Sequence, residues 1–381
     1  MCGIAGVFDL SAKRNIAPDV LNKMNQVQFH RGPDEGGSYY DPGLGLAHRR
    51  LSIIDLSTGQ QPLFNHDQSV CIVFNGEIYN FKELTAQLKG KGYHFKTHSD
   101  TETIVHAWEE WGEHCVEHLR GMFAFAIYDK NKQALFMARD RLGVKPLFYA
   151  VTMDNFLIFG SELKVLLEHP SFRKNMDITG IEDYCALGYI PEPKTIYKNV
   201  YKLQAGYRLL LKRGQKQFLP EQYWEIPFAT NQALSEAQAA EELIEHLKEA
   251  VDIRMIAEVP LGAFLSGGVD SSGVVAMMSQ LQKEPVNTCS IAFDDKKFNE
   301  SEYADSVSKQ YNTNHYVETV ATDDFELLDQ LALLYDEPYA DSSAIPTYRV
   351  CQLARKNVTV ALSGDGGDEP LSGYRRHIWH M

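Results

Sequence analysis

The sequence predicts an α+β domain with mostly antiparallel sheets, followed by an α/β domain built on a parallel sheet. Before residue 227, short runs of β-branched and aromatic residues are bounded by Gly, Asp and Asn, with a few amphipathic runs between them. After residue 235, strand-like and helix-like runs alternate strictly, as in parallel sheets wrapped by helices. The length of 381 residues suits two or three domains, and we expect domains over 1–226 and 233–381.

The composition is typical of a globular protein with small partners. Hydrophobic residues make up 44% and charged residues 23% of the chain, which predicts neither disorder nor a fibrous repeat. The net charge of −14 disfavours tight binding to a phosphate backbone, so we expect no nucleic-acid partner. No apolar run reaches the about 18 residues of a membrane helix, and the start lacks the basic region of a signal peptide. We therefore expect a cytoplasmic protein without membrane contact.

The expected elements of the first half follow from the spacing of apolar residues. Strands are expected where aromatic and β-branched residues cluster, at 4–8, 44–54, 69–80, 121–129, 134–140 and 155–161. Helices are expected where apolar residues recur every three or four positions, at 18–28, 81–92 and 101–112. Two closely spaced prolines within 188–202 predict an extended crossover, and one more hairpin follows it.

A small, polar linker separates the halves, and a helix with an apolar stripe is expected after it, over 236–257. Later strands are expected at 259–266, 286–293, 315–320 and 358–364. The intervening helices are expected at 273–282, 301–311, 323–335 and 344–355. Because no helix is expected after the last strand to cover it, we expect the chain to be truncated at its carboxyl end.

Cys2 differs from the other five cysteines, which lack any CxxC or zinc spacing and are interpreted as buried thiols. Once the initiator methionine is removed, Cys2 would carry a thiol and a free α-amine together. An amine with a pKa of about 7.7 to 8.0 can take the thiol proton near neutral pH, which turns the sulfur into a strong nucleophile. The alternative is that Cys2 stands there by chance behind Met1.

Polar residues near predicted strand ends could serve such a nucleophile. The Asn75 amide and the Gly76 backbone N–H can point at a developing oxyanion, although a plain Asn-Gly hairpin turn is the alternative. Arg31 and Arg50 are candidate anchors for a carboxylate, and Asp100 is one for an ammonium group. Each of these three could instead form a surface ion pair or, for Asp100, a helix cap.

These segments together resemble the class II glutamine amidotransferases, which are amino-terminal nucleophile hydrolases with an αββα sandwich. The resemblance runs to about residue 210 through MCGIAGVF, HRGPD, AHRRLSIID, FNGEIYN, SDTETI, GMFAFAIYD and RDRLGVKPLFY. It implies that Cys2 attacks the side-chain amide of glutamine, that its own α-amine moves the proton, and that Asn75 and Gly76 form the oxyanion hole. The glutamine-binding residues that it implies are Arg50 for the α-carboxylate, and Glu77 and Asp100 for the α-amine.

A second candidate site lies in LSGGVDSS, at the turn from a predicted strand into a predicted helix. Such a turn offers backbone N–H groups, hydroxyls and a helix dipole to a phosphate, and it differs from the Walker and dinucleotide motifs. A second Gly-rich loop, LSGDGGDE, follows the strand VTVAL. Asp270 and Asp368 of the two loops would make hard oxygen ligands for Mg²⁺ that bridges phosphates. Flexible or solvated turns are the alternative interpretation of both loops.

The SGGVDSS loop resembles the pyrophosphate loop of ATP pyrophosphatases, which form acyl-adenylates. Together with the amidotransferase half, DEPYADSSAIPTY and LSGDGGDE, it resembles the glutamine-hydrolysing asparagine synthetase family over nearly the whole chain. The resemblance implies that ATP, with Mg²⁺ as cofactor, adenylates aspartate or another carboxylate acceptor, and that ammonia released at Cys2 attacks the adenylate. A homodimer is retained as one possible assembly. The implied ATP-binding residues are Leu265, Ser266, Gly267, Gly268, Asp270, Ser271, Ser272, Ile291, Ser363 and Gly364.

Three features depart from the family pattern. Asp365 stands where one branch has a glutamate that helps to deprotonate ammonia, so the resemblance implies Asp365 as a shorter catalytic base. Pro370 replaces a residue of the usual GDELFGGY run and removes a backbone donor, so an altered loop geometry is expected. The family also continues into helices that carry a catalytic lysine and part of the acceptor pocket, and these lie beyond Met381.

Other functions stay open from the sequence. The chain could be a glutaminase with an impaired synthetase half, or a regulator that binds glutamine or ATP; truncation favours these interpretations and the intact motifs oppose them. An amidotransferase for another carboxylate, such as a sugar acid or a peptide side chain, is also open. A role in transfer RNA modification is opposed by the net charge of −14 and by the lack of a basic aromatic patch.

Overall fold

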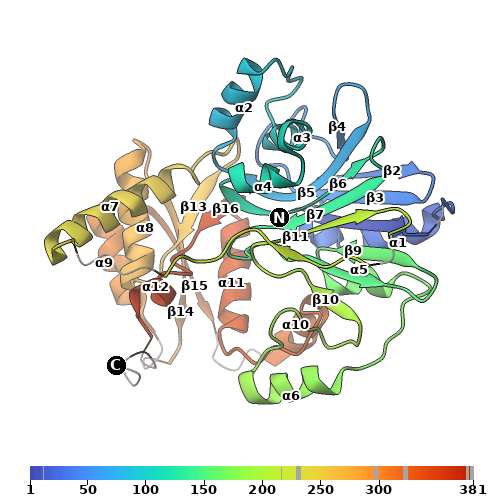
Figure 1. Cartoon of the computed structure of the whole chain (residues 1–381). Helices are drawn as coiled ribbons and strands as arrows, with labels where there is room; N and C mark the ends of the chain where they lie inside the picture. Colours follow the sequence, from blue (N-terminus) through green and yellow to red (C-terminus); the bar gives the residue numbers. More distant parts are fainter. Residues whose placement is uncertain are drawn as a thin grey trace. The chain divides into compact units, whose positions relative to one another are not determined.

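Two units make up the chain in the computed structural model, which describes residues 1–11, 13–215, 217–228, 233–295, 299–320, 325–374 and 377 (Figure 1). The first unit consists of Met1–Phe228 and the short segment Tyr335–Ala340. The second unit consists of Ala229–Leu334 and Asp341–Met381. The chain therefore returns to the first unit for one segment before it completes the second.

The first unit contains two six-stranded antiparallel sheets. The first sheet has the order β10-β8-β9-β1-β3-β2, with β1 (Gly3–Asp9), β2 (Glu35–Asp41), β3 (Leu44–Arg50), β8 (Phe148–Val151), β9 (Phe156–Gly160) and β10 (Val200–Lys202). The second has the order β12-β11-β7-β6-β5-β4, with β4 (Leu63–Phe64), β5 (Val70–Ile78), β6 (Gly121–Asp129), β7 (Ala134–Arg139), β11 (Tyr207–Lys212) and β12 (Glu221–Gln222).

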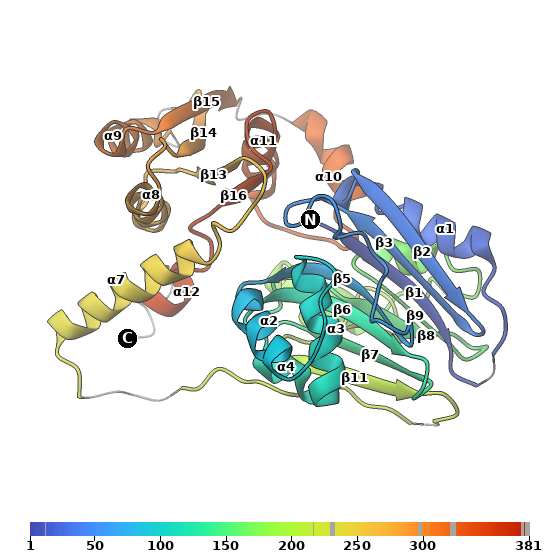
Figure 2. The ribbon, with the colours of Figure 1, turned by 90° about the horizontal axis from the view of Figure 1, so that it is seen from above.

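The two sheets face each other and helices cover their outer sides (Figure 2). Apolar residues of both sheets, such as Ile4 and Val73, share one core cluster between them. Met24 packs on the outer side of the first sheet, and Trp108 stacks on Phe136 of the second with ring centroids 4.9 Å apart. The result is the predicted αββα sandwich. The helices of this unit are α1 (Pro18–Gln26), α2 (Phe81–Gly90), α3 (Asp100–Trp111), α4 (Cys115–His118), α5 (Leu163–Leu167) and α6 (Ile178–Leu187).

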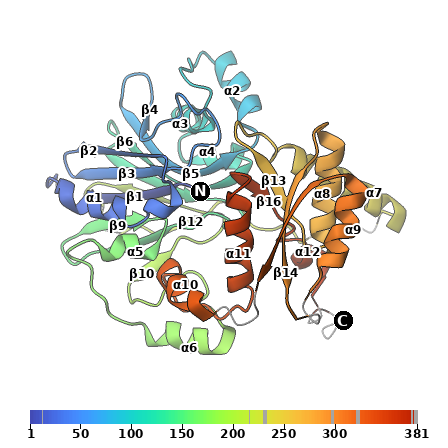
Figure 3. The same cartoon turned by 180° about the vertical axis from the view of Figure 1, so that it is seen from behind.

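The second unit has a four-stranded parallel sheet of order β15-β14-β13-β16, as predicted. Helices α8 and α9 cover one face of this sheet and α11 covers the other (Figure 3). The strands are β13 (Leu261–Phe264), β14 (Asn287–Phe293), β15 (Asn314–Val320) and β16 (Val360–Leu362). The helices are α7 (Glu236–Asp252), α8 (Val269–Leu281), α9 (Ser301–Tyr311), α10 (Leu328–Leu334), α11 (Ala344–Arg355) and α12 (Asp368–Leu371).

Several elements differ from the expectation. The strand expected over 44–54 ends at Arg50, and the helix expected over 236–257 ends at Asp252. Strand β2 and helix α6 were not expected; β2 is rich in Gly and half exposed, whereas α6 starts at an Asp177 cap that accepts a hydrogen bond from the Thr179 amide. Residues 323 and 324 of the helix expected over 323–335 lie outside the described residues. Within the described part of the chain, no helix is both long and apolar enough to cross a membrane.

Candidate active sites

Cys2 lies directly before β1, half buried at the amino-terminal end of that strand. Its carbonyl accepts a hydrogen bond from Arg31 Nε at 2.9 Å, and its thiol lies 3.7 Å from the carbonyl oxygen of Leu51. Burial raises the pKa of the Cys2 thiol, while the positive charges of the chain's amino terminus, Arg50 and Lys145 oppose this shift. A base that takes the thiol proton is therefore needed for a reactive thiolate at neutral pH.

Asn75 and Gly76 lie inside β5, paired with Ala124 and Phe123 of β6. The hairpin-turn interpretation is therefore wrong. Asn75 is fully buried, and neither polar atom of its amide has a hydrogen-bond partner among the described residues. A Cβ at Gly76 would lie 2.1 Å from the Met122 carbonyl oxygen, so only glycine fits there. A buried amide without partners is costly to the fold, and a ligand oxygen would satisfy it.

Strand β3 links the segments that carry Cys2 and Asn75. His48 of β3 pairs in register with Ile4 of β1, two residues after Cys2. His48 of β3 joins the two sheets there, because its Nε2 bonds the Phe74 carbonyl at 3.0 Å. Burial lowers the pKa of His48 to about 3, so this ring is neutral at physiological pH and holds the strand next to Asn75 without a charge.

Lys145 is a neighbour of Cys2 that the sequence analysis did not single out. Its side chain is buried, and its charge interacts with those of Glu77, Arg31 and Cys2. Burial lowers the pKa of Lys145, and the charge of Glu77 opposes that shift. The available signal was its position in RDRLGVKPLFY, a motif that supported the resemblance without assigning a role to the lysine.

Arg50 ends β3 with its guanidinium buried. It forms an ion pair with Glu35 at 3.0 Å and donates a 2.6 Å hydrogen bond to the Asp55 carbonyl. Arginine has five N–H donors in a planar fork, so anchoring a substrate carboxylate would use the donors that these bonds leave.

Asp100 is the first residue of α3 and does not cap the helix, so the interpretation of Asp100 as a helix cap is wrong. Ser99 is the cap, because its hydroxyl accepts a hydrogen bond from the Thr101 amide. The Asp100 carboxylate instead accepts one from the Ile78 amide at 2.9 Å, directly after Glu77. Burial raises the pKa of Asp100 to about 6, partly opposed by hydrogen bonds from the backbone of Ile78 and Thr101. The Asp100 carboxylate thus lies against the backbone at the carboxyl end of β5, one residue after Glu77.

The first glycine-rich loop of the second unit joins β13 to α8. Gly268 immediately precedes the helix, so the first N–H groups of α8 face the end of the loop. The Ser266 and Ser271 hydroxyls bond each other at 2.9 Å and shape the turn. The hydroxyl of Ser272 is buried and has no partner within the described part of the chain. This loop can therefore offer both backbone and side-chain donors to an anion.

The second loop packs directly on the first. A Cβ at Gly364 would lie 2.7 Å from the Ser271 nitrogen, and one at Gly367 would lie 2.6 Å from Asp270 Cγ. Asp270 and the loop that carries Asp368 are thereby brought together. The described residues contain no cluster of three or more His, Cys, Asp or Glu side chains for a metal. The pair Asp270 and Asp368 would nevertheless suit Mg²⁺, which commonly takes one or two carboxylates together with substrate phosphates.

The remaining candidates differ in accessibility. Leu265 has its side chain in the core and its N–H bonded to the Cys289 carbonyl, whereas Ile291 is half buried on β14. Asp365 is exposed, and its carboxylate accepts a 3.1 Å hydrogen bond from Ser363.

Pro370 is the third residue of α12, where a backbone N–H has no partner within the helix, so the proline is accommodated. The expected disturbance of the loop by Pro370 is thus not required.

Comparison with known families matches both units. Residues 1–224 match the model of a glutamine amidotransferase domain, and residues 242–381 match that of asparagine synthase. Among solved structures, glutamine phosphoribosylpyrophosphate amidotransferase from B. subtilis is 13% identical, with a TM-score of 0.42 over 84% of this chain and 81% of that chain. The family assignment rests on the sequence matches.

Curated relatives match over nearly the whole chain. A putative asparagine synthetase (glutamine-hydrolysing) 2 of Methanocaldococcus jannaschii is 40% identical over 99% of this chain and 76% of its own length. Asparagine synthetase (glutamine-hydrolysing) 1 of Bacillus subtilis is 36% identical over 98% of this chain, which spans 59% of that relative.

Proposed function

This chain belongs to the family of glutamine-hydrolysing asparagine synthetases, and from that premise we propose that it uses glutamine and ATP to convert a carboxylate into an amide. Glutamine would be hydrolysed in the first unit, and the ammonia would be consumed in the second. The observation that carries the proposal is the buried Asn75 amide, which has no partner among the described residues and directly follows Phe74, whose carbonyl is bonded by His48 of the strand next to β1. Such a group is ready to bind an oxyanion.

Hydrolysis would begin after removal of Met1, when the α-amine of Cys2 is free to take the thiol proton. The sulfur would attack the side-chain carbonyl carbon of glutamine, and the oxyanion would bind the Asn75 amide and the Gly76 N–H. The amine would pass its proton to the leaving ammonia, and water would then cleave the thioester to give glutamate. Arg50 would hold the α-carboxylate of glutamine, and Glu77 with Asp100 would hold its α-amine.

Ligation would occur at the two loops of the second unit. The backbone N–H groups at the start of α8 and the hydroxyls of Ser266, Ser271 and Ser272 would hold the phosphates of ATP. The acceptor carboxylate would attack the α-phosphorus and release pyrophosphate, and ammonia would then displace AMP while Asp365 takes a proton. Asp270 and Asp368 would hold Mg²⁺, which would neutralise phosphate charge when bound.

We propose aspartate as the acceptor, because the relatives named above are asparagine synthetases. A homodimer and a cytoplasmic location belong to the same proposal. All six cysteines carry free thiols, as proteins of reducing compartments commonly do.

The test measures both half-reactions of the purified chain. We expect glutamate release from glutamine, and AMP and pyrophosphate formation from Mg-ATP, ammonium and aspartate. Cys2→Ala should abolish glutamate release and leave ammonium-dependent AMP formation intact, whereas Asp270→Asn should do the reverse. Cys185 and Cys351 are exposed, contrary to the interpretation of these cysteines as buried thiols, so Cys185→Ala serves as the control that keeps both reactions. Loss of both reactions in Cys2→Ala would contradict two separate sites, and glutamate without AMP in the wild type would contradict the ligase.

A further inference from the structure

The segment Tyr335–Ala340 lies in sequence between α10 and α11 of the second unit, yet it belongs to the first unit. Asp336 is one anchor of this segment. Its carboxylate accepts a 3.1 Å hydrogen bond from the backbone N–H of Lys164 and lies 3.3 Å from the Nζ of the same lysine. The side chains of Asp336 and Lys164 are 11% and 15% exposed, so water screens this ion pair only weakly.

Glu337 is a second, separate anchor of the segment. One of its oxygens accepts a 2.7 Å hydrogen bond from the Ile196 amide, and the other lies 2.6 Å from Nζ of Lys202. The amide of Ala340 also donates to the carbonyl of Gly188 at 2.9 Å. The segment is therefore held by polar contacts at both ends.

The Asp336 anchor continues through charged groups to Cys2. Lys164 Nζ lies 3.4 Å from Glu162 Oε2, and Glu162 Oε1 lies 3.1 Å from Arg31 Nη1. Arg31 Nε in turn donates to the Cys2 carbonyl at 2.9 Å. The Arg31 and Glu162 side chains are 9% and 12% exposed. Alternating charges thus connect the candidate nucleophile with a segment contributed by the sequence of the second unit.

The inner members of this network are shared between several partners. Lys164 interacts with both Asp336 and Glu162, and Glu162 interacts with Lys164, with Arg31 and with the His30 ring, whose Nε2 lies 2.9 Å from Oε1. Without the Asp336 charge, Lys164 would bind Glu162 more strongly and compete with Arg31 for that carboxylate. The buried Nη2 of Arg31 has no partner among the described residues, so fewer bonds oppose a shift of Arg31.

We propose that Asp336 is a positioning residue for Cys2, acting through Lys164, Glu162 and Arg31. When Tyr335–Ala340 is seated in the first unit, this network holds Arg31 on the Cys2 carbonyl and fixes the backbone of the nucleophile. This inference rests on the proposed function for the reaction that is controlled.

The test compares Asp336→Asn with Glu337→Gln. Both substitutions remove one carboxylate charge from the same segment, but only Asp336 belongs to the network that reaches Arg31. We expect Asp336→Asn to lower the rate of Cys2 alkylation by iodoacetamide about fivefold, and kcat for glutamine hydrolysis by a similar factor with KM unchanged. Glu337→Gln should leave both rates within twofold of the wild type. Peptide mapping by mass spectrometry separates Cys2 from the other thiols.

A double-mutant cycle tests the route. In a Lys164→Met background, Asp336→Asn should have no further effect on alkylation, because the ammonium group that links Asp336 to Glu162 is absent. The double variant also removes both charges of the pair and provides a folded comparison if Asp336→Asn alone is unstable. Equal effects of Asp336→Asn and Glu337→Gln, or additive effects in the cycle, would overturn the proposal. Alkylation needs no glutamine, so it decides the inference even if the wild type releases no glutamate and the proposed function fails.

Discussion

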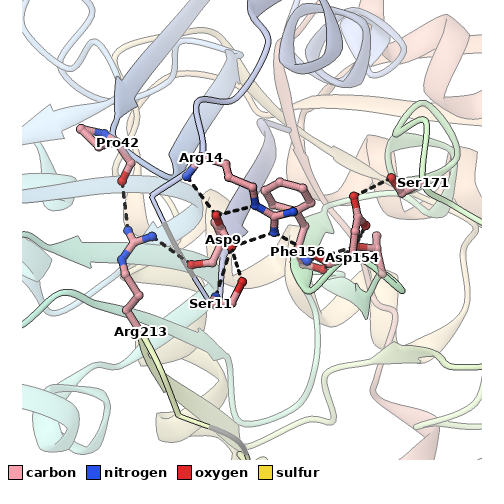
Figure 4. A network of polar contacts seen from close by, with 9 residues as sticks. Asp9, Ser11, Arg14, Pro42, Asp154, Phe156, Ser171 and Arg213 are labelled. Atoms are coloured by element: carbon pink, nitrogen blue, oxygen red, sulfur yellow. Dashed lines mark hydrogen bonds and ion pairs between the residues drawn. The ribbon is translucent and has the colours of Figure 1, made fainter.

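The two ends of β1 differ in how their polar groups are satisfied. At the carboxyl end, the Asp9 carboxylate accepts hydrogen bonds from the backbone and hydroxyl of Ser11 and from the backbone and guanidinium of Arg14 (Figure 4). Arg14 lies over the Phe156 ring at 4.0 Å and donates to the Asp154 carbonyl. At the amino end, by contrast, several buried polar atoms have no partner among the described residues. They are both amide atoms of Asn75, both amide atoms of Gln28 and the Nη2 of Arg31.

This difference separates a structural end of the strand from a reactive one. A buried polar group with partners contributes to stability, whereas one without partners lowers it by about 1–3 kcal/mol. Active sites tolerate that loss of stability, because a polar group that already has a partner cannot bind a charge that develops in the transition state. The contrast predicts that changes at the Cys2 end alter catalysis, and that changes at the Asp9 end alter the free energy of unfolding.

The largest effect is expected for Asn75→Ala. It should lower kcat for glutamine hydrolysis by about 10²- to 10³-fold, because it removes an oxyanion donor. The free energy of unfolding should not fall, since no hydrogen bond is lost and a buried amide without partners is removed. Glutamate release and urea unfolding measure the two quantities.

Asn65→Ala is the matched control, because Asn65 is also a buried asparagine and lies close to the start of β5. Its amide bonds the Ser69 hydroxyl, the Glu109 carboxylate and the Val70 backbone N–H. This variant should lose about 2–3 kcal/mol of stability and keep its hydrolysis rate. If Asn65→Ala and Asn75→Ala changed kcat and the free energy of unfolding in the same proportion, the distinction between buried amides with and without partners would be wrong.

Asp9→Ala should produce the opposite profile to Asn75→Ala. We expect a loss of about 2–4 kcal/mol in the free energy of unfolding, because backbone and guanidinium donors lose a charged acceptor. The value of kcat should stay within twofold of the wild type, since Asp9 lies at the far end of β1. Urea unfolding and glutamate release on the same preparation check this, and a tenfold fall in kcat of the folded variant would refute it.

The pH dependence of stability should have opposite signs at the two ends. Burial raises the pKa of Asp100 to about 6, against about 3.9 in an unfolded chain. The native state then binds more protons, so Asp100 lowers stability as the pH rises from about 4 to about 6, by up to about 3 kcal/mol. For Asp154, burial raises the pKa, but hydrogen bonds from Thr152 and Ser171 outweigh it and lower the pKa, so its contribution is lost as the pH falls.

Urea unfolding of Asp100→Asn and Asp154→Asn between pH 3 and pH 7 isolates these two contributions. Relative to the wild type, Asp100→Asn should become more stable as the pH rises towards 6. Asp154→Asn should show its largest deficit at neutral pH and approach the wild type in acid. If the stability difference from the wild type changed with pH in the same direction for both variants, burial would not determine the pKa of Asp100.

The sequence predicted most of the fold, and the candidate site residues that it proposed stand in local motifs. Cys2 lies next to a regular strand, and Asn75 and Asp270 lie within a strand and a helix whose patterns are visible in a short window. The strand β2 was missed because its glycines and half-exposed side chains weaken the alternation of apolar residues. The position of Asn75 inside a strand was also ambiguous, since Asn-Gly pairs are common in turns.

Contacts between distant residues could not be predicted in the same way. Lys164 and Asp336 are 172 positions apart, and each alone is an ordinary charged residue, one within α5 and the other shortly after α10. Lys145 follows β7 in the chain, yet its Nζ lies 3.2 Å from Met1 Sδ and its charge interacts with that of Cys2. Long-range pairing depends on the packed fold, which local spacing does not encode.

The smallest effect is expected for Arg14→Lys, which keeps the charge beside Asp9 and removes the forked donor. Lysine can still approach the carboxylate, but it cannot bond Asp9 and the Asp154 carbonyl in the same geometry or stack as a plane on Phe156. We expect a loss of about 1 kcal/mol, less than for Asp9→Ala, because the buried carboxylate keeps its backbone donors. Urea unfolding of both variants tests the order. A loss in Arg14→Lys as large as in Asp9→Ala would mean that the guanidinium fork, rather than the full set of donors, stabilises this end of β1.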